Sequence, residues 1–364
     1  MASIDPGGAE PRAGDAGGAA GPAGLPILQI HPSLRCNLAC RHCYSVSGPQ
    51  ASLELETAAV LAAIDDAAAL GYRVVSVSGG EPLLYRGLPS VLERAKRLGL
   101  RTTVTTNGFF SRDERFRRLR GLVDVLAISL DGPPPLHDEI RGRAGAFDRL
   151  VAGLDAVRAA EIPFGFIHTL TRRSFPHLGW VADFALRQGA KLLQIHPLES
   201  AGRAATDLRG EGPDDDLLAR AYVFAYALGA HYDGLLKVQL DLVHRDLLRD
   251  APGSFYAADA ATGTDDVSAA SSLGLVVLEP DGSLVPVSFG FSRDYRVANV
   301  HEARFAAAWP EYRKRTLPRF QALCRSTWEE LTAPDAPLLV NWHEAIVAAS
   351  RGADGSSRRL PLAG

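Results

Sequence analysis

The sequence predicts an α/β fold in which a parallel sheet closes into a barrel or a partial barrel. Strand-like and helix-like segments alternate from residue 25 to about residue 230, which is typical of βα units around a parallel sheet. Polar or glycine-rich motifs follow the predicted strands at their carboxyl ends, where such folds gather their functional residues. After residue 230 the alternation stops, and a smaller C-terminal part follows.

The elements are predicted in chain order from short apolar runs and from helical spacing of apolar residues. Strands are expected at 25–34, 74–78, 102–106, 123–130, 164–170 and 192–198, and helices at 55–70, 88–98, 147–160 and 177–188. Beyond them we expect a strand at 236–240, a short helix at 243–248, a polar loop or linker at 257–272, and a hairpin of 273–279 and 283–287. Pro280-Asp281-Gly282 is a good turn sequence for that hairpin. A helical part ends the chain.

Composition limits the possible classes of protein. The chain has 364 residues and is 46% hydrophobic, enough for one large domain and a smaller one. Its net charge of −3 favours neither nucleic acid nor an anionic membrane as partner, and no apolar stretch is long enough to span a bilayer. Residues 1–24 lack the apolar segment of a signal peptide, so they are expected to be a disordered leader, and 351–364 a disordered tail. The cysteines and the lack of an export signal predict a cytoplasmic protein.

Three of the four cysteines lie within eight residues, directly after the first predicted strand. Cys36, Cys40 and Cys43 have the spacing C-x3-C-x2-C, and thiols this close do not easily pair into disulfides. The pattern therefore indicates a metal site. Because a [4Fe–4S] cluster normally takes four thiolates, three would leave one iron with an open position. The alternative is a structural zinc ion, with His42 or His31 as fourth ligand.

At these residues the chain resembles the radical S-adenosylmethionine (SAM) superfamily, whose signature loop has this spacing. The resemblance implies a partial (β/α)6 TIM-like barrel of the radical SAM type over residues 25–232, carrying one [4Fe–4S] cluster on the three cysteines. It also implies that SAM chelates the open iron. His42 occupies a position that is usually aromatic in this family, and its ring or backbone could meet adenine.

Other motifs imply contacts with SAM. Gly79-Gly80-Glu81-Pro82 matches the family's glycine-rich element after the second strand, which implies that this backbone and Glu81 hold the SAM amino group. Ser129 and Asp131 share one face by strand alternation, and the resemblance supports a role near ribose for both. Asn107 is either a similar candidate or a turn cap.

Two further segments are tied to SAM and to the substrate by the same resemblance. Arg141 is expected to pair with the SAM carboxylate, with Arg143 as the alternative. His196 ends the sixth strand, where the family places adenine contacts, although it could equally be a core histidine. Glu199 and Arg203 are expected at the barrel mouth, facing the substrate.

Residues 233–350 resemble a SPASM/twitch extension, a small α+β unit of peptide-modifying radical SAM enzymes. In that extension a Pro-Asp-Gly turn leads to a Pro-Cys and later to a Cys-x2-Cys near a tryptophan. Here Pro286-Val287 lacks the first cysteine, and only Cys324 remains near Trp328. One thiolate cannot hold a second cluster, so the extension is expected to shape and close the pocket. Cys324 is either a buried packing residue or a hydrogen donor to a substrate radical.

The resemblance implies hydrogen abstraction from a C–H bond, with a ribosomally synthesised peptide precursor as the expected substrate. Epimerisation, rearrangement and crosslinking are the expected outcomes. The alternatives are a small molecule, such as a sugar, nucleoside or amino acid, and a non-catalytic iron–sulfur or zinc scaffold. An electron donor such as a flavodoxin or ferredoxin is an expected partner, and neither nucleic acid nor a membrane is.

Overall fold

The computed structural model describes residues 24–109, 114–256 and 268–352. The expected leader before residue 24, the expected tail after residue 352 and residues 257–267 of the expected linker lie outside the described residues. In the described part of the chain, no helix is long and apolar enough to cross a membrane.

A ten-stranded sheet is the centre of the fold, with the strand order β11-β10-β9-β1-β2-β3-β4-β5-β6-β7. Strands β1 to β7 run parallel to one another, which confirms the predicted α/β class. Their bounds are β1 Ile27–Ile30, β2 Val74–Val77, β3 Arg101–Thr106, β4 Val125–Ser129, β5 Phe164–Leu170, β6 Leu192–Pro197 and β7 Lys237–Leu240. The first strand is shorter than predicted, because Pro32 has no N–H to donate to a ladder.

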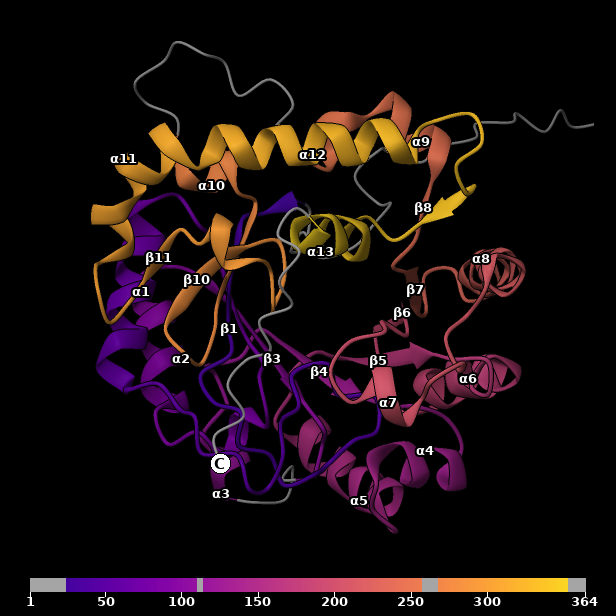
Figure 1. Cartoon of the computed structure of the whole chain (residues 1–364). Coiled ribbons are helices and arrows are strands. Elements are labelled where there is room, and N and C mark those ends of the chain that lie inside the picture. The colour runs from indigo at the N-terminus through magenta and orange to yellow at the C-terminus, as the bar shows by residue number, and fades with distance from the viewer. Residues whose placement is uncertain (1–23, 110–113, 257–267, 353–364) are drawn as a thin grey trace, which may run out of the picture.

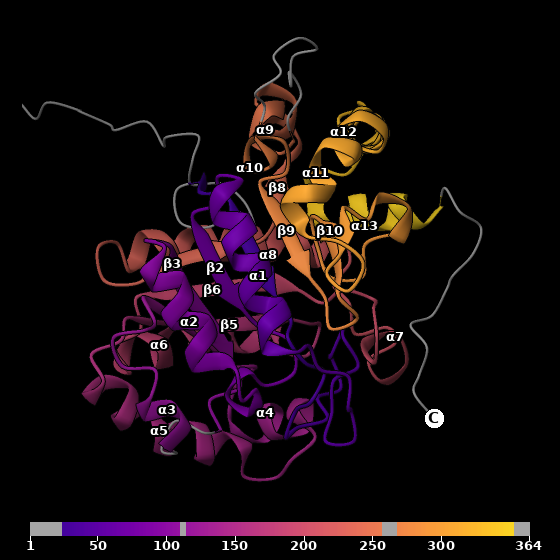
Figure 2. The same cartoon turned by 90° about the vertical axis from the view of Figure 1, so that its left-hand side faces the viewer.

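Helices cover the outside of this parallel sheet (Figures 1 and 2). They are α1 Thr57–Ala69, α2 Leu88–Arg97, α3 Glu114–Arg117, α4 Pro134–Arg141, α5 Ala146–Ala159, α6 Leu178–Arg187, α7 Ala204–Asp207 and α8 Asp215–His231. Leu126 and Ile128 of β4 are buried in the core beneath them, whereas Ala127 and Ser129 on the other face of β4 are only half-buried. The inner face of the sheet therefore carries the smaller and more polar side chains.

The C-terminal part is joined to the sheet along the free side of β1. Strand β9 (Leu275–Leu278) pairs in parallel with β1, and β10 (Ser283–Pro286) and β11 (Ala298–Asn299) continue the sheet in antiparallel fashion. The hairpin is thus confirmed. Its pairing with β1 was not predicted, and it makes the sheet continuous across the expected boundary between 25–232 and 233–350.

The segment after β7 differs from the prediction of a helix at 243–248. Its first two residues form β8 (Val243–His244), which pairs with β12 (Leu339–Val340), and α9 (Arg245–Asp250) starts only afterwards. These two residues form a strand rather than a helical turn because their backbone pairs with β12. The remaining helices are α10 Ala269–Ser272, α11 Phe305–Arg315, α12 Leu317–Leu331 and α13 Trp342–Gly352.

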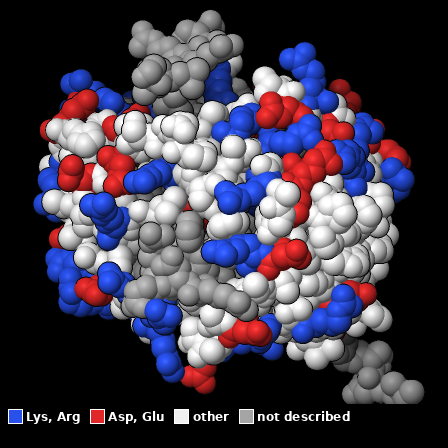
Figure 3. Space-filling view, turned by 90° about the horizontal axis from the view of Figure 1, so that it is seen from below, with Lys and Arg blue, Asp and Glu red and all other residues white. Residues whose placement is uncertain are grey.

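The two ends of the molecule are built from different parts of the chain. Helix α12 lies at one end, and α4 and α5 lie at the other (Figures 1 and 2). Seen from the end of α4 and α5, Lys and Arg are interspersed with Asp and Glu rather than gathered in one patch (Figure 3). This mixture agrees with a net charge close to zero for a chain of this length.

Candidate functional site

The cysteine loop joins β1 to α1 and brings three free thiols together. Cys36 and Cys40 are buried, Cys43 is half-buried, and none forms a disulfide. The pKa of Cys36 is raised to about 12, mainly by burial and to a smaller extent by the negative charges of Glu81 and of the other two cysteines. Isolated buried thiols of this kind stay neutral, whereas a bound metal deprotonates them.

Each of the three sulfurs also has a neighbouring hydrogen-bond donor. The Cys36 sulfur accepts from the backbone N–H of Leu38 at 3.5 Å and lies 3.8 Å from Asn107 Nδ2. The Cys40 sulfur lies 3.7 Å from Arg141 Nη1, and the Cys43 sulfur 3.4 Å from the Ser45 hydroxyl. Hydrogen bonds to sulfur are one of the means by which proteins set the potential of an iron–sulfur cluster.

This donor set fits a [4Fe–4S] cluster with three protein ligands. In the described ranges, no three Cys, His, Asp or Glu side chains are arranged to hold a single metal ion. Each of the two histidines proposed for the zinc alternative has one ring nitrogen engaged elsewhere: His42 Nε2 lies 3.2 Å from Asp131 Oδ1, and His31 Nε2 lies 2.9 Å from Gln29 Nε2.

The glycine-rich motif after β2 holds the base of the cysteine loop. Gly80 N–H donates to the Ser33 carbonyl at 2.8 Å, and Glu81 N–H donates to the Arg35 carbonyl at 2.9 Å. A Cβ on Gly80 would lie only 2.2 Å from that Arg35 oxygen, so any other residue would push the two backbones apart. Gly79 has a φ of +110°, which few side chains tolerate. Pro82 begins a buried 3-10 turn, Pro82–Leu84.

Glu81 is buried at the carboxyl ends of β2 and β3. Its carboxylate accepts hydrogen bonds from the Thr106 hydroxyl at 2.8 Å and from the Asn107 backbone N–H at 2.9 Å. Burial raises the pKa of Glu81 to about 7, and these hydrogen bonds oppose the rise. The Asn107 side chain links this group to the cysteine loop, because its Nδ2 donates to Asn37 Oδ1 at 2.9 Å. Both expected SAM contacts therefore lie beside Cys36.

Asp131 and Arg141 form a buried ion pair next to Cys40. Arg141 Nε lies 2.6 Å from Asp131 Oδ2, and His42 Nε2 lies 3.2 Å from the other oxygen. Burial alone would raise the pKa of Asp131, but the positive charge of Arg141 and the contact with His42 outweigh it and lower the pKa far below its usual range. The buried carboxylate is thus held by an ion pair with Arg141 and by His42, although Asp131 Oδ2 and Arg141 Nε are not oriented for a hydrogen bond to each other. The expected role of Asp131 near ribose stays a prediction.

The neighbouring residues remain open as SAM contacts. Arg141 keeps its place beside the cysteine loop, although one side of its guanidinium is held by Asp131. Arg143, the alternative, lies over the Phe109 ring at 5.0 Å. Ser129 ends β4 and is half-buried on the inner face of the sheet, so its predicted role near ribose stays a prediction.

His196 is part of an ionic cluster at the ends of β6 and β7. Its Nδ1 lies 3.1 Å from Asp241 Oδ2, and its Nε2 lies 3.0 Å from Glu199 Oε1. Burial alone would lower the pKa of His196, but the two carboxylates raise it to about 10, so the ring is an imidazolium at neutral pH. Both ring nitrogens are occupied by side chains rather than being free for adenine. Sequence reasoning missed Asp241, although it follows a predicted strand as Asn107 and Asp131 do.

Arg203 is bound to the cysteine loop, and its expected role towards the substrate stays a prediction. Its side chain donates to the carbonyls of Cys40 at 2.8 Å and Ser47 at 2.7 Å, and its backbone N–H donates to the Cys43 carbonyl at 2.9 Å. A Cβ on the preceding Gly202 would lie 2.4 Å from that same Cys43 oxygen. The segment after β6 therefore also holds the cysteine loop, at residues other than those held by Gly80 and Glu81.

Cys324 lies away from this site, within α12. It is almost completely buried in the main hydrophobic core, and burial raises the pKa of its thiol to about 12. The cysteine loop contacts α4 through the Arg41 N–H and the Ile140 carbonyl, 2.8 Å apart, and α4 and α12 lie at opposite ends of the molecule (Figure 1). This placement favours the packing role of Cys324, and the hydrogen-donor alternative stays a prediction.

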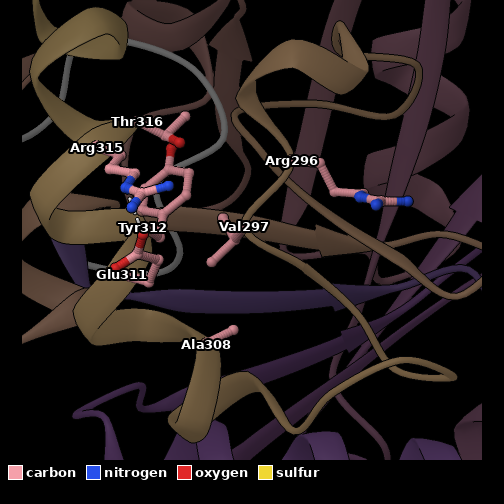
Figure 4. Close-up of a pocket in the computed structure, with 7 residues that line it drawn as sticks. All are labelled: Arg296, Val297, Ala308, Glu311, Tyr312, Arg315 and Thr316. Atoms are coloured by element: carbon pink, nitrogen blue, oxygen red, sulfur yellow. Dashed lines mark ion pairs between the residues drawn. The ribbon is translucent and has the colours of Figure 1, made fainter.

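A pocket of about 360 Å³ also lies in the C-terminal part (Figure 4). Tyr312 and Thr316 line it from the α11 side, and Val297 lines it from the loop before β11. The residues that line it include neither a cysteine nor a residue of the glycine-rich motif. It therefore belongs to the packing between α11 and the C-terminal strands.

Comparison with known proteins gives a family match and several relatives. The family model of the Radical SAM superfamily matches residues 30–184. Fe-coproporphyrin III synthase of Methanosarcina barkeri is 30% identical over 50% of this chain and 46% of that protein. Pre-heme d1 synthase of Dinoroseobacter shibae is 28% identical over 78% and 73%, and PqqA peptide cyclase of Ruegeria pomeroyi is 28% identical over 69% and 64%. The chain spans about half the length of several curated relatives that it matches.

Solved structures share the fold at low sequence identity. SuiB of Streptococcus suis, crystallised with the precursor peptide SuiA, superposes with a TM-score of 0.62 at 16% identity over 82% of this chain and 67% of that chain. The enzyme anSMEcpe, crystallised with AdoMet and the Cp18Cys peptide, gives a TM-score of 0.60 at 15% identity over 89% and 94%. The cysteine loop, the parallel sheet and the family match agree with one another, and residues 30–184 therefore form a radical SAM domain, the kind of domain that uses a [4Fe–4S] cluster and SAM.

Proposed function

We propose that this protein is a radical SAM enzyme that removes a hydrogen atom from a C–H bond of a ribosomally synthesised peptide. The observation that carries the proposal is the cysteine loop, which presents three free thiols next to the glycine-rich motif. When bound, the cluster and SAM together supply a 5′-deoxyadenosyl radical. Cys36, Cys40 and Cys43 would hold the cluster, and an electron donor such as a flavodoxin or ferredoxin would reduce it.

The residues around the loop suit the two charged ends of a methionine group. Glu81 offers a carboxylate whose pKa of about 7 lets it accept a hydrogen bond from an ammonium at neutral pH. Arg141 offers a guanidinium beside the same loop, 3.7 Å from the Cys40 sulfur. Opposite charges next to one loop would orient SAM before any reaction.

Both a curated relative and two solved structures support a peptide substrate. PqqA peptide cyclase is named for its action on a peptide, and the SuiB and anSMEcpe structures contain bound peptides. The second candidate is a small molecule, which the similarity to pre-heme d1 synthase favours, since that alignment covers 78% of this chain. Epimerisation, rearrangement and crosslinking remain the proposed outcomes on a peptide.

Two measurements test the radical chemistry. Anaerobic reconstitution should give about four iron and four sulfide per chain, because only one three-cysteine loop is present. The reduced protein should then convert SAM to 5′-deoxyadenosine, and a Cys36/Cys40/Cys43→Ala triple variant should not. Cleavage of SAM by the triple variant would refute the assignment, and a cluster-loaded protein that forms no 5′-deoxyadenosine would favour the scaffold alternative.

The substrate class needs a separate experiment. Candidate precursor peptides are short open reading frames next to the gene, and each can be incubated with the reduced enzyme and SAM in D2O. A mass change in the peptide, or deuterium at one Cα, would identify the modified residue. Modification of a tetrapyrrole or a sugar, with every such peptide unchanged, would decide for the small-molecule candidate.

A further inference from the structure

Helix α8 is apolar on its outward face as well as on its inward face. Its inward residues, which are buried in the fold, are Leu217, Ala221, Ala225 and Leu228. No Asp, Glu, Lys or Arg occurs in the segment from Ala221 to Tyr232, although a surface helix normally carries charged residues opposite its buried face. Figure 1 shows α8 at the outer edge of the molecule. The described part of the fold therefore does not cover the outward face of this helix.

The outward residues form one continuous stripe along α8, because they lie in two adjacent rows spaced by three and four residues. This α8 stripe consists of Ala219, Tyr222, Val223, Tyr226, Ala227 and Ala230, all of which are exposed. Tyr226 is 77% exposed, and Val223 is 67% exposed. Single apolar residues are common on protein surfaces, but a contiguous apolar patch with several large side chains is typical of an interaction site.

The arginine beside the α8 stripe already has partners within the chain. Arg220 Nε lies 3.1 Å from Asp216 Oδ2, and its guanidinium carbon lies 5.4 Å from the centre of the Phe175 ring. Phe224 is turned towards the same ring, with 6.4 Å between the two centroids. Asp215 lies one turn before the stripe, at the positive end of the helix dipole. Within the described structure, covering the stripe would thus desolvate no unpaired charge, and the surface that fits it is itself apolar.

The order of residues along the α8 stripe makes the stripe complementary to itself. In two antiparallel helices related by a two-fold axis, residues at equal distances on either side of the axis face each other. With the axis at the middle of the stripe, Tyr222 faces Ala227 of the second copy, and Val223 faces Tyr226 of the second copy. The small Ala227 side chain leaves room for the tyrosine ring opposite it, as a groove does for a ridge in helix packing. A second copy of this chain is therefore an apolar surface of matching shape.

The area of the α8 stripe reaches what a specific interface requires. A tyrosine carries roughly 200 Å² of surface, so the exposed parts of Tyr222 and Tyr226, at 37% and 77%, come to roughly 230 Å² per copy. With Val223 and the three exposed alanines, the stripe offers on the order of 500 Å² per copy, or about 1,000 Å² when two copies meet. This is the lower limit for a specific protein interface, so we expect an association that depends on protein concentration.

We propose that the α8 stripe is the interface of a homodimer, in which two copies of the chain pair their α8 helices in antiparallel orientation about a two-fold axis. The apolar outward face, its exposed area and its complementarity to itself support this partner over an unrelated protein. The inference is independent of the proposed function, because α8 carries no residue of the candidate site.

Sedimentation velocity of the reconstituted full-length protein tests the dimer. From low to high micromolar concentration, the mass should rise from the 38.9 kDa of one chain towards twice that value. Val223→Glu puts a charge into the middle of the apolar stripe and should keep the protein monomeric over the same range. The matched control, Leu98→Glu, adds the same charge at an exposed apolar residue after α2 and should dimerise like the wild type. A wild-type protein that stays monomeric throughout would overturn the proposal, as would a Val223→Glu variant that dimerises like the wild type.

A pair of charged variants tests the antiparallel register. Tyr222→Glu and Ala227→Lys each introduce a good helix former at an exposed position, and each alone should weaken self-association about tenfold or more, the effect of one desolvated charge. An equal mixture of the two should restore the dimer, because the new carboxylate then faces the new ammonium of the other copy. Tyr222→Glu mixed with Ala219→Lys, whose charges lie about two helical turns apart in this register, should not restore it. Equal restoration by both mixtures, or by neither, would refute the proposed pairing.

Discussion

Replacing Asp131 by Asn should destabilise the protein strongly, because it leaves a buried cation without its partner. The two side chains of the pair are almost completely buried, and Arg141 Nε lies 2.6 Å from Asp131 Oδ2. Two unit charges at that separation attract by roughly 6 kcal/mol at an effective dielectric constant of about 20. Breaking a buried pair of this kind typically costs about 3–5 kcal/mol. Asn keeps the size of the side chain and removes only the charge.

The free energy of unfolding of the metal-free protein measures this loss. Urea denaturation followed by tryptophan fluorescence at pH 7 should give about 3–5 kcal/mol less stability for Asp131→Asn. The matched control is Glu139→Gln on α4, the helix that follows Asp131; the Glu139 carboxylate pairs with Arg41 and Arg173 at 39% exposure. Exposed pairs of this type contribute roughly 0–1 kcal/mol. Equal losses in the two variants would refute our account of Asp131.

The sign of the pH dependence gives a second check on the same pair. The pKa of Asp131 is lowered in the folded state from an ordinary value near 3.8. The stabilisation is therefore fully present above pH 4 and is lost only as the pH falls towards the lowered pKa. The difference between wild type and Asp131→Asn should stay constant from pH 5 to pH 8. If the difference in the free energy of unfolding changes between pH 5 and pH 8, the titration of another group is responsible.

Three other predictions concern the cofactors. Arg141→Gln should lower the reduction potential of the reconstituted cluster, because a cation beside Cys40 stabilises the more negative, reduced state. The expected shift is on the order of 60 mV, which corresponds to a tenfold change in a one-electron equilibrium. A redox titration monitored by EPR measures the potential, and an unchanged value would contradict the prediction. SAM binding should tighten from pH 6 to pH 8 as Glu81, with its pKa of about 7, becomes ionised, and equilibrium dialysis with Glu81→Gln should show no such trend. Gly80→Ala should reduce the iron content after reconstitution, because its Cβ would lie 2.2 Å from the Arg35 carbonyl, whereas Gly229→Ala, with no atom nearby, should retain it.

The sequence was informative where a pattern is local. Strand β5 (Phe164–Leu170) has the predicted bounds, because its apolar residues are enclosed by polar or proline-containing segments. Helix α4 was missed, since it starts in Pro133-Pro134-Pro135, and a proline run resembles a break. Proline is tolerated in the first turn of a helix, where its missing N–H is not needed. The prolines that begin this helix therefore concealed it in the sequence, and with it the helical position of Arg141.

Long-range pairing was beyond sequence reasoning for a different reason. The free side of β1 can accept any strand with a compatible pattern, and nothing in the 25–34 segment specifies Leu275–Leu278 as the neighbour. The same holds for β8, since its partner strand β12 comes more than 90 residues later in the chain. The three cysteines and Glu81, by contrast, were found because each follows a predicted strand.

The contacts of the cysteine loop explain why those strand-end motifs act together. Gly80 and Glu81 hold the start of the loop at Ser33 and Arg35, Ile140 holds its middle at Arg41, and Arg203 holds its end at Cys43. These contacts come from the ends of β2 and β6 and from α4, so the loop is fixed by three separate parts of the barrel. A loop fixed in this way pays little ordering entropy when it binds a cluster. The sheet therefore both positions the thiols and shapes the space in which a substrate would meet them.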